Sequence, residues 1–298
     1  MPITGRAAVS YTDGPSLRIG LCQVFTEPWK VEDNVERTLT TLEMAALDGA
    51  DIAVTPECVF HAYPELSTPD AREKMLQIAE PLDGPHLRRL REKAAELEMA
   101  VVVGFAEAGT SGRIHNAAAL IDRKGDIQFV YRKVHLRHFE WDAYDGFFTP
   151  GDEFYASRME FSGGREFNIG VMICFDREIP ESARCLRALG AEFIACPLAT
   201  DTYDMFQTEN RADNEMVTRC RAAENECFIA VVNHAGRFNG GSFLVGPFGE
   251  CLAQMDERPG SKVVGAQVSM IQECFHSNPR GWMAYQFRRP EVYSKHLE

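Results

Sequence analysis

Apolar residues recur along this chain in two alternating patterns, one typical of buried strands and the other of amphipathic helices. Short continuous apolar runs favour strands covered on both faces, whereas apolar positions three and four residues apart favour helices that pack by one face. The predicted strands are Leu17–Val24, Asp51–Thr55, Ala100–Phe105, Phe167–Ile173, Phe193–Cys196 and Phe228–Asn233. The predicted helices are Val31–Ala46, a segment through Leu87–Leu97, Pro180–Leu189 and Ala212–Cys227.

Two further regions contain strand signals with no helix between them. The turn Asp122-Arg123-Lys124-Gly125 separates the apolar runs His115–Ile121 and Ile127–Arg132, which predicts a β-hairpin. The end of the chain adds Ser242–Val245, Cys251–Met255 and Lys262–Val268. Helices that alternate with strands and are followed by hairpins predict an α/β fold, with mixed sheets and helices on their outer faces.

No Pro- or Ser-rich linker and no break in composition divides the chain. We therefore predict one domain over residues 17–275, preceded by a polar lead-in over residues 1–16. The last segment, residues 276–298, mixes arginines with four aromatic side chains, Trp282, Tyr285, Phe287 and Tyr293. Such a segment is too aromatic for a free end, and we expect it to pack on its own domain or on a second subunit.

Composition excludes several classes of partner. The 298 residues carry 31 Lys and Arg against 44 Asp and Glu, a net charge of −13, so nucleic acid and anionic membrane surfaces are not expected partners. The longest apolar stretch, Met99–Ala106, is far shorter than the roughly 20 residues of a bilayer span. Nine cysteines, an odd count without any Cys-x-x-Cys, favour a reducing compartment, and we predict a cytoplasmic protein.

Three reactive residues stand where predicted strands end, namely Glu57, Lys133 and Cys174. Ligands of open α/β sheets bind at that edge. A thiol with a pKa of about 8.5 needs a neighbouring base or cation to act as a nucleophile. A carboxylate can take the thiol proton and return it to a leaving amine, while an ammonium can hold the oxyanion of a tetrahedral intermediate. Taken singly, each residue is also explained as a packed cysteine, a solvated acid or an exposed lysine.

Histidine is the commonest base for a catalytic cysteine, and four histidines lie in predicted loops: His61, His115, His135 and His234. None has the flanking pattern of a papain-like or caspase-like protease. A Gly-x-Cys-x-Gly elbow, as in class I glutaminase domains, is also excluded, because position 176 is Asp. Glu57 and Lys133 are then the remaining partners for Cys174.

With these residues the chain resembles the nitrilase superfamily of carbon–nitrogen hydrolases, whose triad is Glu, Lys and Cys in that order. The matching segments are Thr55-Pro56-Glu57, Arg132-Lys133-Val134-His135-Leu136 and Ile173-Cys174-Phe175-Asp176-Arg177-Glu178-Ile179-Pro180-Glu181. Later landmarks also match: Arg221-Ala222-Ala223-Glu224-Asn225, Val232-Asn233, Gly241-Ser242 and Pro247-Phe248-Gly249-Glu250. The resemblance covers roughly residues 17–270 and rests on three motifs in the right order and spacing.

The resemblance implies a four-layer α-β-β-α sandwich that forms a homodimer or a larger homo-oligomer and uses no metal or organic cofactor. It also implies roles for the matching residues. Glu57 would be the general base and acid, and Cys174 the nucleophile that forms a thioester. Lys133 and the backbone N–H of Phe175 would stabilise the oxyanion.

Many members have a second active-site glutamate shortly before a Pro-Gly pair. Here Pro150-Gly151 is preceded by Asp145, which lies nearest the expected place and is the acid we predict. Glu140 and Asp142, earlier in the same loop, are the alternatives, and a solvated acidic loop is the simpler explanation.

The motif Cys174-Phe175-Asp176 resembles the amidase and N-carbamoylase branches more than the Cys-Trp-Glu of nitrilases proper. We therefore predict hydrolysis of a small amide or N-carbamoyl compound, with a nitrilase as the alternative. The substrate-pocket candidates are Phe60, Tyr63, Trp141, Phe147, Ala199 and Asp201. Asp201 or Asp204 would pair with a cationic substrate. A non-catalytic binding protein of the same fold, and acyl transfer to an amine instead of water, are the rival functions.

Overall fold

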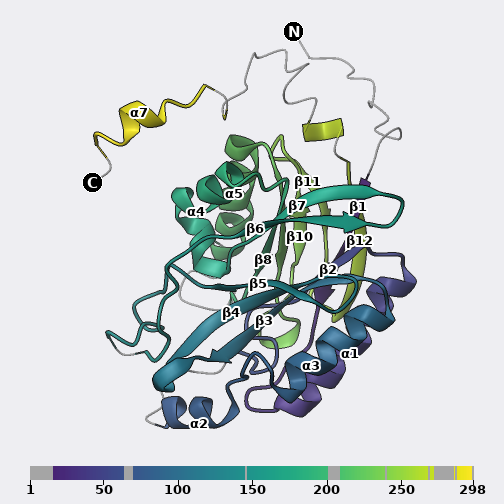
Figure 1. Ribbon diagram of the computed structural model, residues 1–298, viewed down its shortest axis with the longest axis vertical. Helices are drawn as coiled ribbons and strands as arrows, with labels where there is room; N and C mark the ends of the chain where they lie inside the picture. The colour runs from purple at the N-terminus through teal and green to yellow at the C-terminus, as the bar shows by residue number, and fades with distance from the viewer. Residues whose placement is uncertain are drawn as a thin grey trace.

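Two six-stranded sheets form the centre of this computed structural model, which describes residues 16–63, 70–144, 146–200, 209–238, 240–267, 269–271, 285 and 287–296 (Figure 1). The first sheet has the order β12 (Gly260–Gln267), β1 (Ser16–Gln23), β2 (Ile52–Val54), β3 (Ala100–Ala108), β4 (Ile114–Ile121) and β5 (Ile127–Arg132). The second has the order β11 (Cys251–Gln254), β10 (Phe243–Val245), β9 (Phe228–Val232), β8 (Phe193–Pro197), β7 (Arg165–Val171) and β6 (Ala156–Phe161).

Both sheets are mixed, and their register brings distant strand ends to one edge. Strands β1, β2 and β3 are parallel, with Ile19 opposite Ile52 and Ile52 opposite Ala100. The hairpin β4–β5 then returns antiparallel twice, so β5 runs parallel to β2. In the second sheet β7, β8 and β9 are parallel. The chain after β2 and the chain after β5 therefore leave the first sheet at the same edge.

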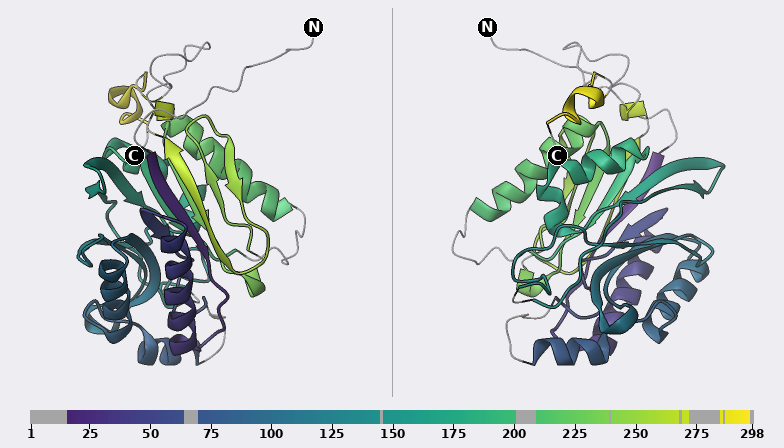
Figure 2. Two further views of the ribbon diagram at one scale, coloured as in Figure 1. Left: turned by 90° about the vertical axis from the view of Figure 1, so that its right-hand side faces the viewer. Right: turned by 60° about the vertical axis from the view of Figure 1, so that its left-hand side comes forward.

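Helices cover the outer face of each sheet (Figure 2). Helices α1 (Val31–Leu47) and α3 (Pro85–Glu96) pack on the first sheet, and α4 (Pro180–Ala188) and α5 (Glu209–Asn225) pack on the second. The remaining described helices are α2 (Ala71–Ile78), α7 (Pro290–Tyr293) and the 3₁₀ turns η1 (Thr110–Gly112), η2 (Cys174–Glu178) and η3 (Gly236–Phe238). The predicted four-layer α-β-β-α sandwich is confirmed.

The core between the sheets explains why the predicted strands read as continuous apolar runs. Fully buried side chains from the first sheet, such as Leu21 and Val54, belong to the same cluster as Ile169 and Val171 of the second. Each sheet also packs against helices, so its strands are covered on both faces. A truncation such as Leu21→Ala removes contacts on a buried face and typically costs about 2 to 5 kcal/mol of stability.

Strand β6 and helix α2 were not predicted, and both bury little. Strand β6 buries only Met159 and Phe161 among its six residues, and it lies at the edge of the second sheet. Helix α2 buries only Ala71 and Met75. A single pair of buried positions gives too weak a pattern to separate an edge strand or a short helix from a loop.

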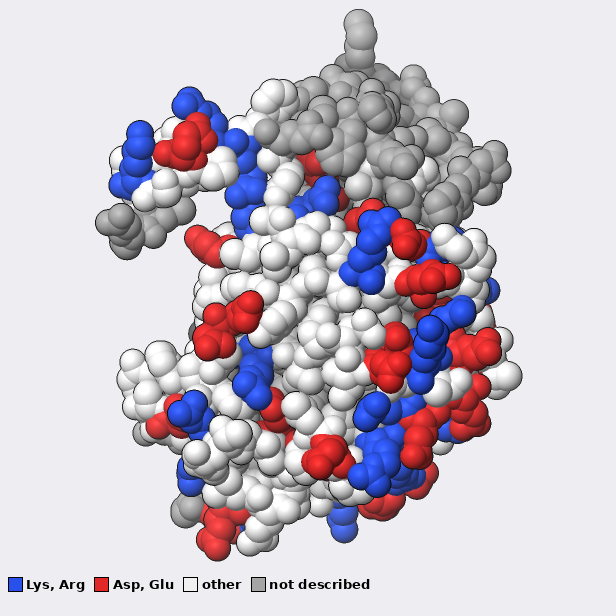
Figure 3. Space-filling view, in the orientation of Figure 1, with Lys and Arg blue, Asp and Glu red and all other residues white. Residues whose placement is uncertain are grey.

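On the face over α1 and α3, acidic and basic side chains are interleaved and do not form a patch of one sign (Figure 3). Arg89 pairs with Glu32 and Glu36, and Lys93 pairs with Glu43 and Glu96. The excess negative charge is therefore not gathered on this face.

Across the described residues, the helices fall short of the length and apolar character that a bilayer crossing requires.

Candidate active site

Glu57 is fixed through the backbone of its own segment. After β2 ends at Val54, the chain crosses β3, where the backbone N–H of Val59 donates to the carbonyl of Gly104 at 2.9 Å. A Cβ at position 104 would lie 2.4 Å from the carbonyl oxygen of Pro56 and 3.0 Å from the Cα of Glu57. The segment can approach β3 this closely only because residue 104 is glycine.

The second sheet holds the same residue from the other side. The N–H of Glu57 donates to the carbonyl of Leu198 at 3.3 Å, and its carbonyl lies 2.7 Å from Nε2 of His234. Since a carbonyl only accepts, His234 donates from Nε2, and its Nδ1 shares a hydrogen bond of 2.7 Å with the Thr26 hydroxyl. His234 is thus a partner of the Glu57 backbone, which the sequence pattern did not indicate.

Lys133 follows β5 directly and joins two buried carboxylates. Its Nζ donates to Glu57 Oε1 at 2.8 Å and to Glu140 at 2.8 and 3.0 Å, and all three side chains are fully buried. Asn116 on β4 donates to the same Glu57 Oε1 at 2.7 Å. We call Glu57, Lys133, Glu140 and Asn116 the acid–lysine cluster. Its charges are held by direct hydrogen bonds.

Of the three loop acids considered from the sequence, Glu140 is the one whose carboxylate accepts hydrogen bonds from Lys133. Asp142 is exposed and accepts a hydrogen bond from Thr149 at 2.5 Å, and Asp145 lies outside the described residues. The backbone around Glu140 is tightly packed, since a Cβ on Gly146 would lie 2.1 Å from the Glu140 carbonyl carbon. Among the described residues, Glu140 is therefore the loop acid in contact with Lys133, and the role of Asp145 stays a prediction.

Burial and charge set the protonation of the cluster. Burial raises the pKa of Glu57, Lys133 opposes that rise, and the charge of Glu140 adds to it. Burial alone would lower the pKa of Lys133, but Glu140 and Glu57 raise it well above its ordinary value, so the ammonium is retained. Glu57 Oε2 is buried and has no hydrogen-bond partner among the described residues. That oxygen is available to accept a proton.

Cys174 begins η2, just after β7, with the left-handed φ of 46°. Its side chain is only 8% exposed. Burial raises the pKa of its thiol, the charge of Glu57 raises it further, and Lys133 opposes that rise. The structure therefore brings Glu57 and Lys133 into contact and places Cys174 within reach of their charges, with the thiol protonated at rest.

Asp176 ties this turn to the segment that carries Lys133. Its fully buried carboxylate accepts the backbone N–H of Ile173 at 3.0 Å and the Tyr131 hydroxyl at 2.7 Å. It also accepts the backbone N–H of His135 at 2.8 Å and lies 2.9 Å from Nδ1 of the same residue. The Asp that excluded a glutaminase elbow is thus the hydrogen-bond link between two site segments.

Phe175, whose backbone N–H is the predicted oxyanion donor, has a half-buried side chain near an exposed cation. The guanidinium carbon of Arg137 lies 5.9 Å from the centre of the Phe175 ring and 4.9 Å from that of Phe139, which is 43% exposed. Arg137 therefore lies close to a ring of η2, the segment Cys174–Glu178, which we call the nucleophile turn after its predicted nucleophile.

The predicted pocket residues differ in how close the structure places them to the acid–lysine cluster. Tyr63 donates a hydrogen bond to Glu140, and its pKa is raised by burial and by the charges of Glu140 and Glu57. Phe147 packs in one apolar cluster with Cys58, while Trp141 is half-buried against Tyr144. Ala199 directly follows Leu198, whose carbonyl accepts the N–H of Glu57. Phe60 lies in the core against Phe105. Asp201 and Asp204 fall outside the described residues.

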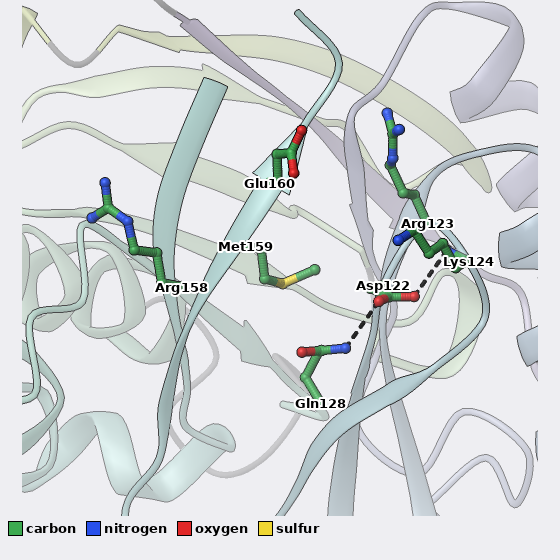
Figure 4. A pocket seen from close by; sticks show the side chains of 7 residues that line it. All are labelled: Asp122, Arg123, Lys124, Gln128, Arg158, Met159 and Glu160. Carbon is green, nitrogen blue, oxygen red and sulfur yellow. Dashed lines mark hydrogen bonds between the residues drawn. The ribbon is translucent and has the colours of Figure 1, made fainter. Parts of the chain in front are cut away.

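A hollow of about 270 Å³ lies elsewhere, between the β4–β5 turn and β6 (Figure 4). Its lining mixes both signs of charge: Asp122, Arg123, Lys124, Gln128, Arg158, Met159 and Glu160. It shares no residue with the acid–lysine cluster or the nucleophile turn. Within the described part of the chain, no group of three or more His, Cys, Asp or Glu side chains is placed to hold a metal ion.

Comparisons with known proteins agree with this fold. The sequence profile of the carbon-nitrogen hydrolase family matches residues 18–274. A Pseudomonas protegens protein named as a hydrolase in the pqqF 5′ region is 33% identical, covering 96% of this chain and 94% of the relative. An (R)-stereoselective amidase of a Pseudomonas species is also 33% identical, over 79% and 80%. The N-carbamoylputrescine amidase of Arabidopsis thaliana is 28% identical, over 88% and 89%.

A solved structure points the same way. A cysteine-to-alanine mutant of the Nesterenkonia sp. AN1 amidase, from the nitrilase superfamily, has a TM-score of 0.74 at 25% identity, covering 95% of this chain and 98% of that one. Two facing mixed sheets covered by helices match the fold of nitrilase-superfamily amidases. The chain belongs to the carbon–nitrogen hydrolase family. The predicted resemblance is confirmed, and the relatives named as amidases support the prediction of an amidohydrolase.

Proposed function

We propose that this protein hydrolyses a small amide or N-carbamoyl compound through a thioester on Cys174, with Glu57 as base and acid. One observation carries the assignment. Glu57 Oε1 accepts Lys133 and Asn116, while Oε2 is buried with no partner among the described residues. A base held rigidly by one oxygen and vacant at the other is suited to exchanging a proton with a nearby thiol.

The first half of the reaction acylates the sulfur. Glu57 takes the proton of Cys174, and the thiolate attacks the carbonyl carbon of the substrate. Lys133 and the N–H of Phe175 stabilise the oxyanion that forms. As the carbon–nitrogen bond breaks, Glu57 gives its proton to the departing ammonia or amine, which leaves a thioester.

The second half restores the enzyme. Glu57 takes a proton from water, the resulting hydroxide attacks the thioester, and the sulfur leaves and recovers a proton from Glu57. The carboxylic or carbamic acid is released. Glu140 supports both halves, because its charge keeps Lys133 protonated and its two oxygens hold the ammonium in place.

The relatives favour amides and carbamoyl compounds over nitriles. Two of these relatives are named as an (R)-stereoselective amidase and an N-carbamoylputrescine amidase. The Cys174-Phe175-Asp176 motif resembles the same branches of the family. Assembly as a homo-oligomer and a cytoplasmic location stay predictions.

The test is a panel of small amides, carbamoylated amines and nitriles, scored for released ammonia, with wild type and Cys174→Ala. Turnover by Cys174→Ala should fall by at least about 10³-fold, with its unfolding midpoint little changed. Cys185→Ala, an exposed cysteine on α4, is the matched control and should keep full activity. Ordinary activity in Cys174→Ala would overturn the proposal.

The same panel separates the rival functions. If the wild type hydrolyses no compound of the panel and its intact mass shows no acyl adduct, the protein is a binding protein and not an enzyme of this type. Release of acid and ammonia from nitriles alone would instead identify a nitrilase. Products that incorporate an added amine would identify acyl transfer in place of hydrolysis.

A further inference from the structure

Asn116 is the neutral member of the acid–lysine cluster, and it contacts all three of the charged members. Its Nδ2 donates to Glu57 Oε1 at 2.7 Å and to Glu140 Oε1 at 3.4 Å. Its backbone carbonyl accepts the N–H of Lys133 at 2.8 Å. The residue lies on β4 and is 1% exposed, so no bulk water competes for these contacts. The direction in which this amide faces therefore matters to the whole cluster.

The amide of Asn116 suits the cluster in one of its two orientations. With Nδ2 toward the carboxylates, Oδ1 faces Cys58, whose thiol donates to it at 3.5 Å. Exchanging the two amide groups would put a carbonyl oxygen in place of the donor that lies 2.7 Å from Glu57 Oε1, and two acceptors at that distance repel each other. The thiol donor on the far side thus favours the orientation that the carboxylates require.

Cys58 is held so that it can act as a donor. Its side chain is fully buried, and burial together with the charge of Glu57 raises the pKa of its thiol well above the ordinary value, so the sulfur keeps its proton. Its backbone has a φ of 47°, in the left-handed region that few residues other than glycine adopt. Its carbonyl accepts the N–H of His61 at 2.9 Å, and a Cβ on Gly104 would lie 3.1 Å from its nitrogen. The thiol is therefore presented to Asn116 from a fixed backbone.

The donors on Glu57 Oε1 decide which oxygen of this carboxylate carries a proton. Lys133 and Asn116 both donate to Oε1, so a proton arriving there would have to displace a hydrogen bond. Oε2 is buried with no partner among the described residues, and it is the oxygen that the proposed reaction uses. An amide turned the other way would leave Oε1 with one donor and one repelling oxygen. The proton would then be retained on Glu57 more strongly and on the wrong oxygen.

We propose that Cys58 is a positioning residue for the reaction: its thiol fixes the amide of Asn116, which keeps Glu57 Oε1 closed to protons and leaves Oε2 to exchange the proton with Cys174. This inference rests on the proposed hydrolase function and adds to it a residue that does not contact the reacting atoms. Cys58 acts through Asn116 alone, and Asn116 acts through Glu57.

A change of pH profile at Cys58 would report on the amide and not on a changed charge. The titratable and charged groups that act with Glu57 come from several elements, namely Lys133, Glu140, Cys174, Cys196, Tyr63 and Cys58 itself. Because the Cys58 thiol is protonated and neutral, its removal leaves every charge in this set as it was.

The test compares Cys58→Ala with Cys58→Ser in the pH profile of kcat/KM, using the panel amide that wild type hydrolyses fastest. A donor to a carboxylate favours its ionised form, so loss of the Asn116 orientation lets the pKa of Glu57 rise. In Cys58→Ala the acid limb should move to higher pH, and kcat should fall about 3- to 10-fold with KM unchanged. Cys58→Ser retains a donor and should restore both.

Cys22→Ala is the matched control for loss of a buried thiol. Cys22 on β1 is also fully buried, and its thiol donates to the carbonyl of Thr41 at 3.8 Å, away from the site. This variant should keep the wild-type limb and kcat, even where its unfolding midpoint falls as far as that of Cys58→Ala. An unmoved limb in Cys58→Ala, or an equal shift in Cys58→Ser or Cys22→Ala, would overturn the inference.

Asn116→Asp removes the amide donor itself without a change of size. The limb should move in the same direction as in Cys58→Ala and further, and kcat should fall by about 100-fold, which corresponds to the usual strength of hydrogen bonds to a charged group. A smaller effect in Asn116→Asp than in Cys58→Ala would contradict the order in which the two residues act.

Alkylation of Cys174 by iodoacetamide, followed by the mass of its peptide, gives a readout that does not require turnover. The rate at pH 7 should fall about 3- to 10-fold in Cys58→Ala and recover in Cys58→Ser. These changes in a protein that hydrolyses no compound of the panel would support the positioning role and reject the proposed function. Hydrolysis by wild type, with the same rates and limbs in Cys58→Ala, would reject the role of Cys58 and leave the proposed function standing.

Discussion

The acid–lysine cluster and the nucleophile turn meet in one site but are built in opposite ways. In the cluster, contributed by the first sheet, Lys133 contacts both Glu57 and Glu140 at hydrogen-bond distance. In the turn, contributed by the second sheet, Cys174 adopts a left-handed φ, and two buried nitrogens of Arg177 have no hydrogen-bond partner among the described residues. One half is electrostatically complete before a substrate arrives, whereas the other half contains groups that a ligand would satisfy.

This difference assigns separate tasks to the two sheets. Fixed charges need no reorganisation during a reaction, which is the main source of electrostatic catalysis in buried sites. Unsatisfied donors instead gain partners only when the correct ligand binds, so they discriminate among substrates. The cluster should therefore govern rate and stability, and the turn should govern selectivity.

The largest expected effect comes from removing the centre of the cluster. Lys133→Met leaves two buried carboxylates without their cation, and we expect a loss of about 3 to 5 kcal/mol in the free energy of unfolding, measured with urea. Activity should disappear as well. Lys93→Met is the matched control, because Lys93 also joins two glutamates, at 2.8 and 2.7 Å, but at the surface. It should cost less than about 1 kcal/mol, and equal losses in the two variants would contradict the distinction drawn here.

A smaller effect is expected when the cluster is displaced without any change of charge. In Gly104→Ala the new Cβ would press on the carbonyl of Pro56 and shift Glu57. We expect a loss of about 1 to 3 kcal/mol in stability and about 10- to 100-fold in kcat. Gly265→Ala on β12 adds the same methyl group where no atom lies within 4 Å, and should be nearly neutral. Full activity in Gly104→Ala would show that the position of Glu57 is not critical.

The mildest change tests the coupling of the two glutamates. The base must be ionised, so kcat/KM falls as pH drops through the pKa of Glu57, which burial and the charge of Glu140 raise. Glu140→Gln removes one of these causes, so the acid limb of the pH profile should move to lower pH. The rate at the optimum should fall about 10-fold. Asp142→Asn, an exposed acid in the same loop, should leave the limb in place. An upward shift in Glu140→Gln would contradict the assignment of Glu57 as base.

The sequence was informative where burial is continuous. Strands such as Ala100–Ala108 and Phe228–Val232 bury nearly every residue, so their apolar runs predicted them directly. Glu57, Lys133 and Cys174 could be predicted as site residues because each stands where a predicted strand ends. Strand β6 and helix α2 were missed because two buried side chains do not make a pattern.

The remaining features of the site depend on contacts that no local pattern encodes. Glu140 could be weighed against Asp142 and Asp145 but not chosen, because the path of its loop depends on the packing of Gly146. The burial of Cys174, and the lack of partners for two Arg177 nitrogens within the described part of the chain, are properties of the assembled layers. His234 and Asn116 carry their roles through a single hydrogen bond each to Glu57, and the side chains alone give no sign of it.

Asp176 accepts hydrogen bonds both from the turn of Cys174 and from the segment after Lys133. One carboxylate therefore connects the two segments. The separation between the Cys174 sulfur and the Lys133 ammonium is set locally by hydrogen bonds about 3 Å long, and not by the thickness of the apolar interior between the sheets. Mutations that change side-chain volume in that interior can therefore accumulate while the reacting atoms keep their separation, which gives this architecture room to diverge in sequence without losing its chemistry.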